Sequence, residues 1–332
     1  MLLFHSTLIL LLALLNPLSA YASASAATGA WCGTPHPSEL GLAAHRRLRA
    51  QEAAAANTTR LNVRQVDSMQ IQVYAHLVRA SESESAVLDW QVRQQVSMLN
   101  QYFRPTGFSF VLAGVDSQIM PNLGPIWGGT EQDLRVKQVR VGDMQTLNFY
   151  VVPSVIDNFA DYAWVNPGIF LPHEDVDANR TGLRSSFPWW SIENPQADGV
   201  VVARDYIPGG RNVGFNTGKI GVHEVGHWLG LLHTFQDGCD GGDLVDDTPA
   251  EASPTFGCPW SRDSCPQPGT DPIHNLMDYT NDACRYQFTT GQVQRMYGMW
   301  TEYRVPPVGG GETGEPIPGE PTEPQPGQPR GF

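Results

Sequence analysis

The pattern of apolar and polar residues predicts a domain of mixed helices and strands across the middle of the chain. Residues 70–78 alternate between apolar and polar side chains, which is typical of a strand with one buried face. His76 belongs to the polar set, so its side chain is expected to face outward. Between residues 88 and 103 the apolar residues recur at helical spacing, and Pro105 ends that pattern.

Three further apolar runs, at residues 108–113, 147–152 and 200–203, predict strands. The last two runs are almost continuously apolar, so we expect them to lie inside a sheet with both faces covered. Thr217 is a suitable N-cap for a helix that follows it. A final amphipathic helix is expected from about residue 290 to residue 303, which gives an α+β domain overall.

The two ends of the chain differ from the middle. Residues 1–24 combine a leucine-rich run with small residues at overlapping A-x-A sites, which indicates a secretory signal peptide that is too short to span a membrane. Residues 25–64 are rich in Ala and Arg, with a helical pattern near residues 40–56 but no core of their own; we interpret them as a pro-segment that lies over the main domain. Residues 305–332 are rich in Pro, Gly and Glu and cannot bury enough apolar surface to fold.

The overall composition narrows the classes of partner. The 332 residues carry a formal net charge of −13, which argues against binding to nucleic acid or to an anionic membrane. Hydrophobic residues make up 41% of the chain, which is enough for a packed core. The signal peptide predicts a secreted protein, most simply a monomer, in which disulfides are expected.

The cysteines and sequons agree with secretion. Four of the five cysteines are close together in sequence and allow three different pairings, which the residues alone do not separate: Cys239, Cys258, Cys265 and Cys284. Cys32 stands alone near the mature N-terminus. Asn57 and Asn179 begin N-glycosylation sequons.

The stretch HEVGHWLGLLH, from His223 to His233, carries the candidate chemistry. His223 and His227 are four residues apart, so on a helix both imidazoles can reach one zinc ion. Glu224 is rotated by about 100° from His223 on the same helix, outside the set of metal ligands but in reach of a water molecule on the metal, as a general base must be.

His233 can join the other two histidines only if the helix ends before it. Gly230 can adopt a positive φ and end the helix, so the chain can turn back with a third imidazole. Three imidazoles leave one coordination position open, which is the arrangement of a catalytic zinc site. At average residue usage the full string occurs by chance in roughly one chain of this length in 10⁵, so ordinary surface or core histidines are a poor explanation.

The zinc string resembles the signature of the metzincin metallopeptidases, and Asn-Leu-Met-Asp-Tyr at residues 275–279 resembles their methionine turn. The wording between the two, which includes His-Thr-Phe at 233–235, Asp-Thr-Pro at 247–249 and Cys-Pro at 258–259, is similar to the pappalysin family and its ulilysin-like secreted branch. The resemblance covers about residues 70–300. An astacin-like metzincin lacks this wording, and a catalytically silent binding protein on the same scaffold would be expected to have lost part of the signature.

The resemblance implies a fold and a reaction. Residues 65–304 would form a metzincin catalytic domain, with a twisted mixed sheet and two long helices in an upper subdomain and an irregular, disulfide-linked lower subdomain. The implied pairings are Cys239–Cys265 and Cys258–Cys284. Met277 would form the floor under the zinc, and Tyr279 would stabilise the oxyanion while zinc and Glu224 hydrolyse peptide bonds in protein or peptide substrates.

Cys32 and Asp282 are candidates for control and specificity. A thiolate is a strong zinc ligand, so an unpaired cysteine in a pro-segment could occupy the open coordination position until activation; the alternative is an incidental or intermolecular thiol. Asp282 follows the methionine turn, where the resemblance implies a cleft pocket that accepts Arg or Lys on the C-terminal side of the scissile bond (P1′). The alternative for Asp282 is a surface or helix-capping role.

A loop of closely spaced oxygen ligands after the third histidine suggests structural calcium, with a solvated acidic loop as the alternative: Asp243, Asp246, Asp247 and Thr248. The segment 157–194 is longer than its equivalent in short pappalysins, at an edge that lines the metzincin cleft. Four other histidines have no metal-ligand spacing and are expected to be ordinary surface residues: His36, His45, His173 and His274.

Overall fold

The computed structural model describes residues 32, 34, 36–57, 68–84, 86–123, 131–153 and 184–305. The predicted signal peptide, the C-terminal tail, His173, the Asn179 sequon and most of the 157–194 segment lie outside these residues. Within the described part of the chain, no helix is both long and apolar enough to cross a membrane.

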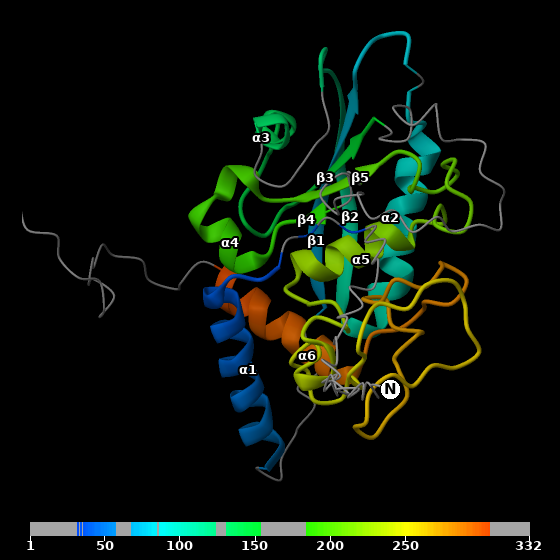
Figure 1. The fold of residues 1–332 in the computed structure, drawn as a ribbon. Coiled ribbons are helices and arrows are strands. Elements are labelled where there is room, and N and C mark those ends of the chain that lie inside the picture. The colour runs from blue at the N-terminus through cyan, green and yellow to red at the C-terminus, as the bar shows by residue number, and fades with distance from the viewer. Residues whose placement is uncertain are drawn as a thin grey trace, which may run out of the picture.

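A five-stranded mixed sheet in the order β2-β1-β3-β5-β4 forms the upper part of the molecule (Figure 1). The strands are β1 (Met69–Arg79), β2 (Phe108–Ile119), β3 (Leu147–Val152), β4 (Arg184–Ser185) and β5 (Val200–Ala203). The first four in this order are parallel, and β4 pairs antiparallel with β5. All residues of β3 and β5 are buried, which confirms that the two continuous apolar runs lie inside the sheet.

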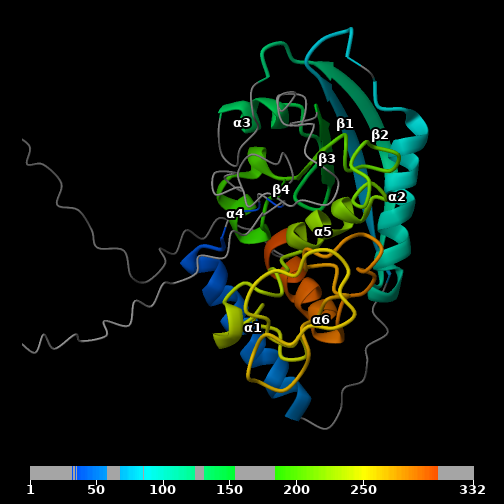
Figure 2. The same ribbon diagram turned by 45° about the vertical axis from the view of Figure 1, so that its right-hand side comes forward.

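Six helices are described: α1 (Glu39–Asn57), α2 (Asp89–Phe103), α3 (Glu131–Lys137), α4 (Pro188–Glu193), α5 (Lys219–Trp228) and α6 (Thr290–Met299). A π-helical turn, Trp300–Arg304, continues α6. In the views of Figures 1 and 2, α2 and α5 pack against the sheet, whereas α1 and α6 lie side by side below it. Every residue of α5 is buried, so the helix that carries the zinc string runs through the centre of the domain.

A buried ion pair fixes the C-terminal end of α5. Arg304 is 1% exposed, pairs with the fully buried Asp198 at 3.2 Å and donates two hydrogen bonds to the backbone carbonyl of Trp228. Its guanidinium also lies 3.6 Å from the centroid of the Trp228 ring. Because this carbonyl belongs to the last residue of α5, the contacts connect the end of the described chain to the helix of the zinc string.

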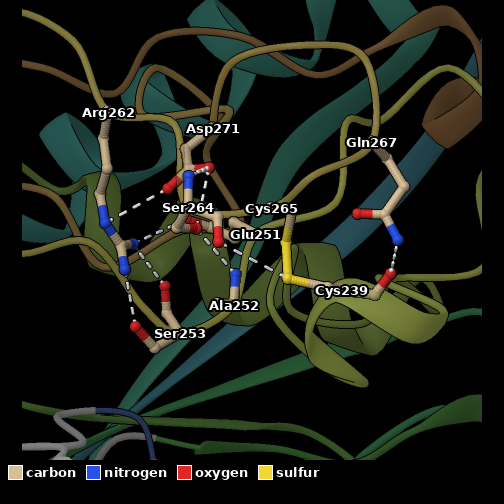
Figure 3. Close-up of a disulfide and its surroundings, with 9 residues drawn as sticks. All are labelled: Cys239, Glu251, Ala252, Ser253, Arg262, Ser264, Cys265, Gln267 and Asp271. Atoms are coloured by element: carbon tan, nitrogen blue, oxygen red, sulfur yellow. Dashed lines mark hydrogen bonds and ion pairs between the residues drawn. A yellow bond between two sulfur atoms is a disulfide. The ribbon is translucent and has the colours of Figure 1, made fainter.

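The lower part of the molecule is irregular and is held together by disulfides. Cys239 pairs with Cys265 and Cys258 with Cys284, which are the pairings implied by the family resemblance. Each closes a loop with a sequence separation of 26 residues, worth about 3.5 kcal/mol on the chain-entropy account. Figure 3 shows the first disulfide beside Arg262, which pairs with the buried carboxylates of Glu251 and Asp271.

Two histidines predicted to lie on the surface are buried, so those predictions are wrong. His76 is fully buried, with Nδ1 at 2.6 Å from Asp116 and Nε2 at 2.9 Å from Asn148. The alternation of β1 holds only in its first half, and residues 75–78 are all buried. His76 can lie inside because Asp116 and Asn148 satisfy its two nitrogens and its ring stacks on Tyr150. His45 is also fully buried, between α1 and α6.

Candidate active site

The helix that carries the zinc string ends two residues before Gly230. The last helical residue of α5 is Trp228, and Gly230 adopts φ +94°. Its N–H donates to the carbonyl of His227 at 2.8 Å, and the N–H of Leu231 donates to Gly226 at 2.9 Å, so the chain turns back within one residue of the helix end. A Cβ at position 230 would lie 2.5 Å from Met299, and only glycine fits here.

This turn brings the three histidines of the string together. The Nε2 atom of His227 lies 3.1 Å from that of His223 and 3.0 Å from that of His233. Nδ1 of His223 lies 2.7 Å from the backbone carbonyl of Leu276, and Nδ1 of His227 lies 2.7 Å from that of Leu231. A carbonyl can only accept, so Nδ1 carries the proton in these two rings and Nε2 has the lone pair that a metal would bind.

The spacing of the three nitrogens fits a zinc ion. Zn–N bonds of about 2.0–2.1 Å in tetrahedral geometry separate the nitrogen ligands by about 3.3–3.4 Å, a few tenths of an ångström more than the separations here. Burial lowers the pKa of His227 to about 4 and those of His223 and His233 well below the ordinary histidine value. Neutral imidazole is the form that binds a metal.

Cys32 completes a four-residue cluster. Its side chain is free of disulfides and 2% exposed. One ligand atom each from Cys32, His223, His227 and His233 lie within 4.8 Å of one another. Among the described residues, no other three or more His, Cys, Asp or Glu side chains bring their ligand atoms this close together.

Glu224 and Tyr279 lie beside this cluster. Glu224 is fully buried, and one of its carboxylate oxygens accepts a hydrogen bond of 3.0 Å from the hydroxyl of Thr34. The hydroxyl of Tyr279 lies 3.3 Å from Nε2 of His233 and donates to the backbone carbonyl of Cys32 at 3.4 Å. Residues 32 and 34 therefore contact both side chains that sequence reasoning assigned to catalysis.

The methionine turn lies directly against α5. Met277 is fully buried, and a Cβ at position 226 would lie 2.5 Å from its sulfur atom. Gly226 was missed by sequence reasoning, although its place inside the zinc string was a possible signal. Thr34 was also missed as a partner of Glu224, although it belongs to the Cys-Gly-Thr wording that begins at Cys32.

Comparisons with known proteins agree with this geometry. The model of the M43 peptidase family, described as pregnancy-associated plasma protein-A, matches residues 148–301. An extracellular metalloprotease of Verticillium alfalfae is 40% identical over 279 residues, which cover 82% of this chain and 90% of that protein. The chain belongs to the M43 family of metalloproteases.

Other relatives agree with this assignment. An extracellular metalloprotease of Pyricularia oryzae is 40% identical over 82% of this chain and 89% of its own length. Mature mirolysin of Tannerella forsythia, solved with a cleaved peptide, is 23% identical and superposes with a TM-score of 0.55 over 72% of this chain and 96% of its own. A promirolysin mutant has a TM-score of 0.56 and covers 82% of this chain and 94% of its own. The metzincin fold expected from the sequence is confirmed, and a metalloprotease of this family implies zinc as its cofactor.

The carboxylate of Asp282 is hydrogen-bonded and ion-paired to other residues of the metalloprotease. Asp282 is 2% exposed; one carboxylate oxygen accepts hydrogen bonds from the N–H and hydroxyl of Thr217 at 3.0 and 2.6 Å, and the other pairs with Arg285 at 2.9 Å. The predicted N-cap role of Thr217 is wrong, because α5 is preceded by Gly218 at the N-cap position. A substrate arginine would have to compete with Arg285 for this carboxylate.

The four predicted calcium ligands already have partners within the protein. Asp243 is buried and accepts from Gln292 and from the backbone of Val245, and burial raises its pKa to about 7. Asp246 pairs with Arg49 of α1. Asp247 accepts from Thr289 and from the N–H of Gly291 at the start of α6, and Thr248 lies 3.5 Å from the hydroxyl of Thr289. Each of these side chains has a partner within the protein, and Thr289 is shared by Asp247 and Thr248, so the structure gives the calcium hypothesis no support.

We predict that Gly230→Ala damages the zinc site far more than Gly257→Ala. Both glycines have positive φ, +94° and +71°, so an alanine at either position carries about 1–2 kcal/mol of backbone strain. Only position 230 adds a clash, with Met299, because nothing lies within 4 Å of a Cβ at 257. Overpacking adds about 1–3 kcal/mol. Urea unfolding and zinc content measure the difference, and equal losses in the two variants would contradict this account.

Proposed function

We propose that this chain is the zymogen of a secreted zinc endopeptidase, in which Cys32 closes the catalytic centre until the pro-segment is removed. The observation that carries the proposal is the cluster of Cys32 with the three histidines of the zinc string, all four ligand atoms within 4.8 Å of one another. Three imidazoles and one thiolate would complete a tetrahedral zinc site and leave no position for water.

A second contact supports latency. The hydroxyl of Thr34 donates to the carboxylate of Glu224, the group that would otherwise accept a proton from water. A short segment thus occupies both parts of the proposed machinery, the metal position through Cys32 and the base through Thr34. Secretion is supported by the predicted signal peptide and by the disulfides, and relatives in several fungi are named extracellular metalloproteases.

After activation the residues of the cluster would act in sequence. Zinc held by His223, His227 and His233 would supply an acidified water and polarise the peptide carbonyl. Glu224, released from Thr34, would take the proton of the attacking water and pass it to the leaving amine. The hydroxyl of Tyr279, released from the carbonyl of Cys32, would be free to donate to the developing oxyanion.

A preference for Arg or Lys at P1′ forms the specificity part of the proposal. The family resemblance supports it, and the net charge of −13 would draw basic segments toward the enzyme. The contacts of Asp282 with Thr217 and Arg285 require that a substrate cation compete for its carboxylate. Calcium has no part in the proposal, because its predicted ligands hold other partners.

We expect Glu224→Gln to abolish proteolysis while zinc remains bound at one ion per chain. The reason is that Glu224 lies next to the three histidines but is not itself a metal ligand. Elemental analysis of the purified protein and peptide hydrolysis after pro-segment removal are the two measurements. A variant that loses its zinc, or that keeps wild-type turnover, would show that Glu224 is not the general base.

Replacement of Cys32 tests latency. The uncleaved Cys32→Ala chain should hydrolyse peptides at a rate at least tenfold above the uncleaved wild type, because a water molecule can then occupy the fourth position. Gels taken at each time point establish that the chain is intact. The matched variant Thr34→Val, which removes only the hydrogen bond to Glu224, should raise activity less. An intact Cys32→Ala chain that stays as latent as wild type would sink the cysteine-switch proposal.

The specificity proposal calls for a cleavage profile on a peptide library, with the activated enzyme and with Asp282→Asn. We expect most wild-type cleavages to precede Arg or Lys, and the variant to lose this preference while it still cuts other peptides. If Asp282 only holds Thr217 and Arg285 in place, the variant loses thermal stability and cuts all peptides more slowly, with its preference unchanged. That result, or a wild-type profile without basic residues at P1′, would contradict the proposal.

A further inference from the structure

The helix α1 covers an apolar surface at the back of the zinc site. Ala44 and Leu48 of α1 are buried in one cluster with residues of the loops and of α6. We call the enzyme side of this contact the α1 docking surface; it comprises Phe187, Leu232, Leu244, Arg295, Met299 and Tyr303. Leu48 also lies against Gly298, where a Cβ would come within 3.0 Å of its side chain.

The two sides of this contact are complementary in charge. Glu52 of α1 makes a two-pronged ion pair with Arg295, with N–O distances of 3.0 and 2.9 Å. Arg49 of α1 pairs with Asp246 at 2.6 Å, and Arg47 pairs with Glu302. In α1, one acidic residue thus pairs with a basic residue of the enzyme, and two basic residues pair with acidic residues of the enzyme.

Arg295 makes this complementarity specific to α1. Its side chain is fully buried, and it donates to the carbonyl of Leu244 as well as to Glu52. Glu52 is its only carboxylate ion-pair partner within the described ranges. Removal of α1 would take the carboxylate of Glu52 away from Arg295 and would uncover the apolar side chains of the docking surface, which is energetically costly.

We propose that the α1 docking surface binds α1 as a separate chain, so that the cleaved pro-segment stays on the enzyme as a non-covalent partner. This inference rests on the proposed zymogen, but it concerns helix docking and not the thiol at the zinc centre. The partner that fits is an amphipathic helix with a carboxylate that reaches Arg295 and a leucine four residues earlier, as Glu52 and Leu48 provide. Activation would then take two steps, cleavage and release.

His45 makes release sensitive to acid. Its Nδ1 lies 2.6 Å from Nη1 of Arg295, and because an arginine can only donate, this nitrogen must be unprotonated in the docked state. Arg295 is the charged group in contact with it, and Glu52 and Asp243 interact with the same guanidinium. Protonation at Nδ1 would place two cations in direct contact in a buried site.

The direction of the effect follows from linkage. Burial, together with Arg295, lowers the pKa of docked His45 well below the ordinary value, whereas in a released segment the imidazole titrates near about 6.5. The released form therefore takes up a proton first as the pH falls. Docking is at full strength above about pH 6.5 and weakens by up to about tenfold per pH unit below it.

The test uses the full-length chain, with a protease site engineered between residues 58 and 67 and with Glu224→Gln to prevent self-digestion. The folded protein is cut at this site while it is held on a support by a C-terminal tag. Release of the N-terminal fragment into the wash is followed by mass spectrometry over time. The measurement is made with Cys32 present and with Cys32→Ala, so that docking through α1 is separated from binding at the metal.

We expect the fragment to stay bound at pH 7.5 in the Cys32→Ala background. Glu52→Gln should speed its release by about 100-fold, because it strands the buried Arg295. Leu48→Ala, which removes apolar contact alone, should speed release by at least about 30-fold. The matched control is Glu39→Gln, at an exposed acid of the same helix that meets only the exposed Arg46, at 3.9 Å; it should change nothing.

Two results would overturn the docking proposal, and a third would overturn the role of His45 in release. One is a fragment that leaves at once in the Cys32→Ala background; if Cys32 alone retains it, the zymogen proposal survives and the docking proposal fails. Another is equal release from Glu52→Gln and Glu39→Gln. The third concerns acid: release should accelerate from pH 7.5 to 5.5 in the parent protein and much less in His45→Gln, and equal acceleration would show that His45 is not the sensor.

Discussion

The structure of the active site depends on the reversal of the chain directly after α5. His223 and His227 lie on one face of α5, so a third histidine can join them only from outside the helix. The chain therefore has to reverse after α5, and Gly230 allows this by adopting a left-handed conformation. The space at Gly230 is filled by Met299 of α6, and the carbonyl of Trp228 is held by Arg304. The geometry of the metal ligands is therefore coupled to the packing of the C-terminal helix.

The N-terminal segment contacts both of these regions, the active site and the C-terminal helix. Cys32 lies with the three histidines of the zinc string, and Thr34 donates a hydrogen bond to Glu224. Further along the same segment, α1 packs against α6 near the turn at Gly230. His45 of α1 lies close to the backbone of Gly230, and its Nδ1 is 2.6 Å from Nη1 of Arg295. In the proposed zymogen, one short segment would block the chemistry with its first residues and anchor itself with its helix. The two tasks would draw on different physical interactions, metal coordination for the first and burial of charge and apolar surface for the second.

Sequence reasoning succeeded where local pattern decides the structure. The spacing of the zinc string places its three imidazoles together, and continuous apolar runs identify the inner strands β3 and β5. It failed where distant segments decide: His76 is buried by the flanking strands, and His45 by the docking of α1 on α6. The hydrogen bonds of Asp282 with Thr217, which is 65 residues away, likewise leave no trace in the local pattern. A periodicity records which face of an element is apolar but not which distant polar groups will meet there.

The most direct test of the account is X-ray absorption at the zinc edge of the intact, full-length protein. Three nitrogen ligands at about 2.0–2.1 Å and one sulfur ligand at about 2.3 Å are expected. In intact Cys32→Ala the sulfur should be replaced by a light atom, with the three nitrogens retained. A spectrum of the wild-type chain that contains only nitrogen and oxygen ligands would contradict the claim that Cys32 closes the catalytic centre.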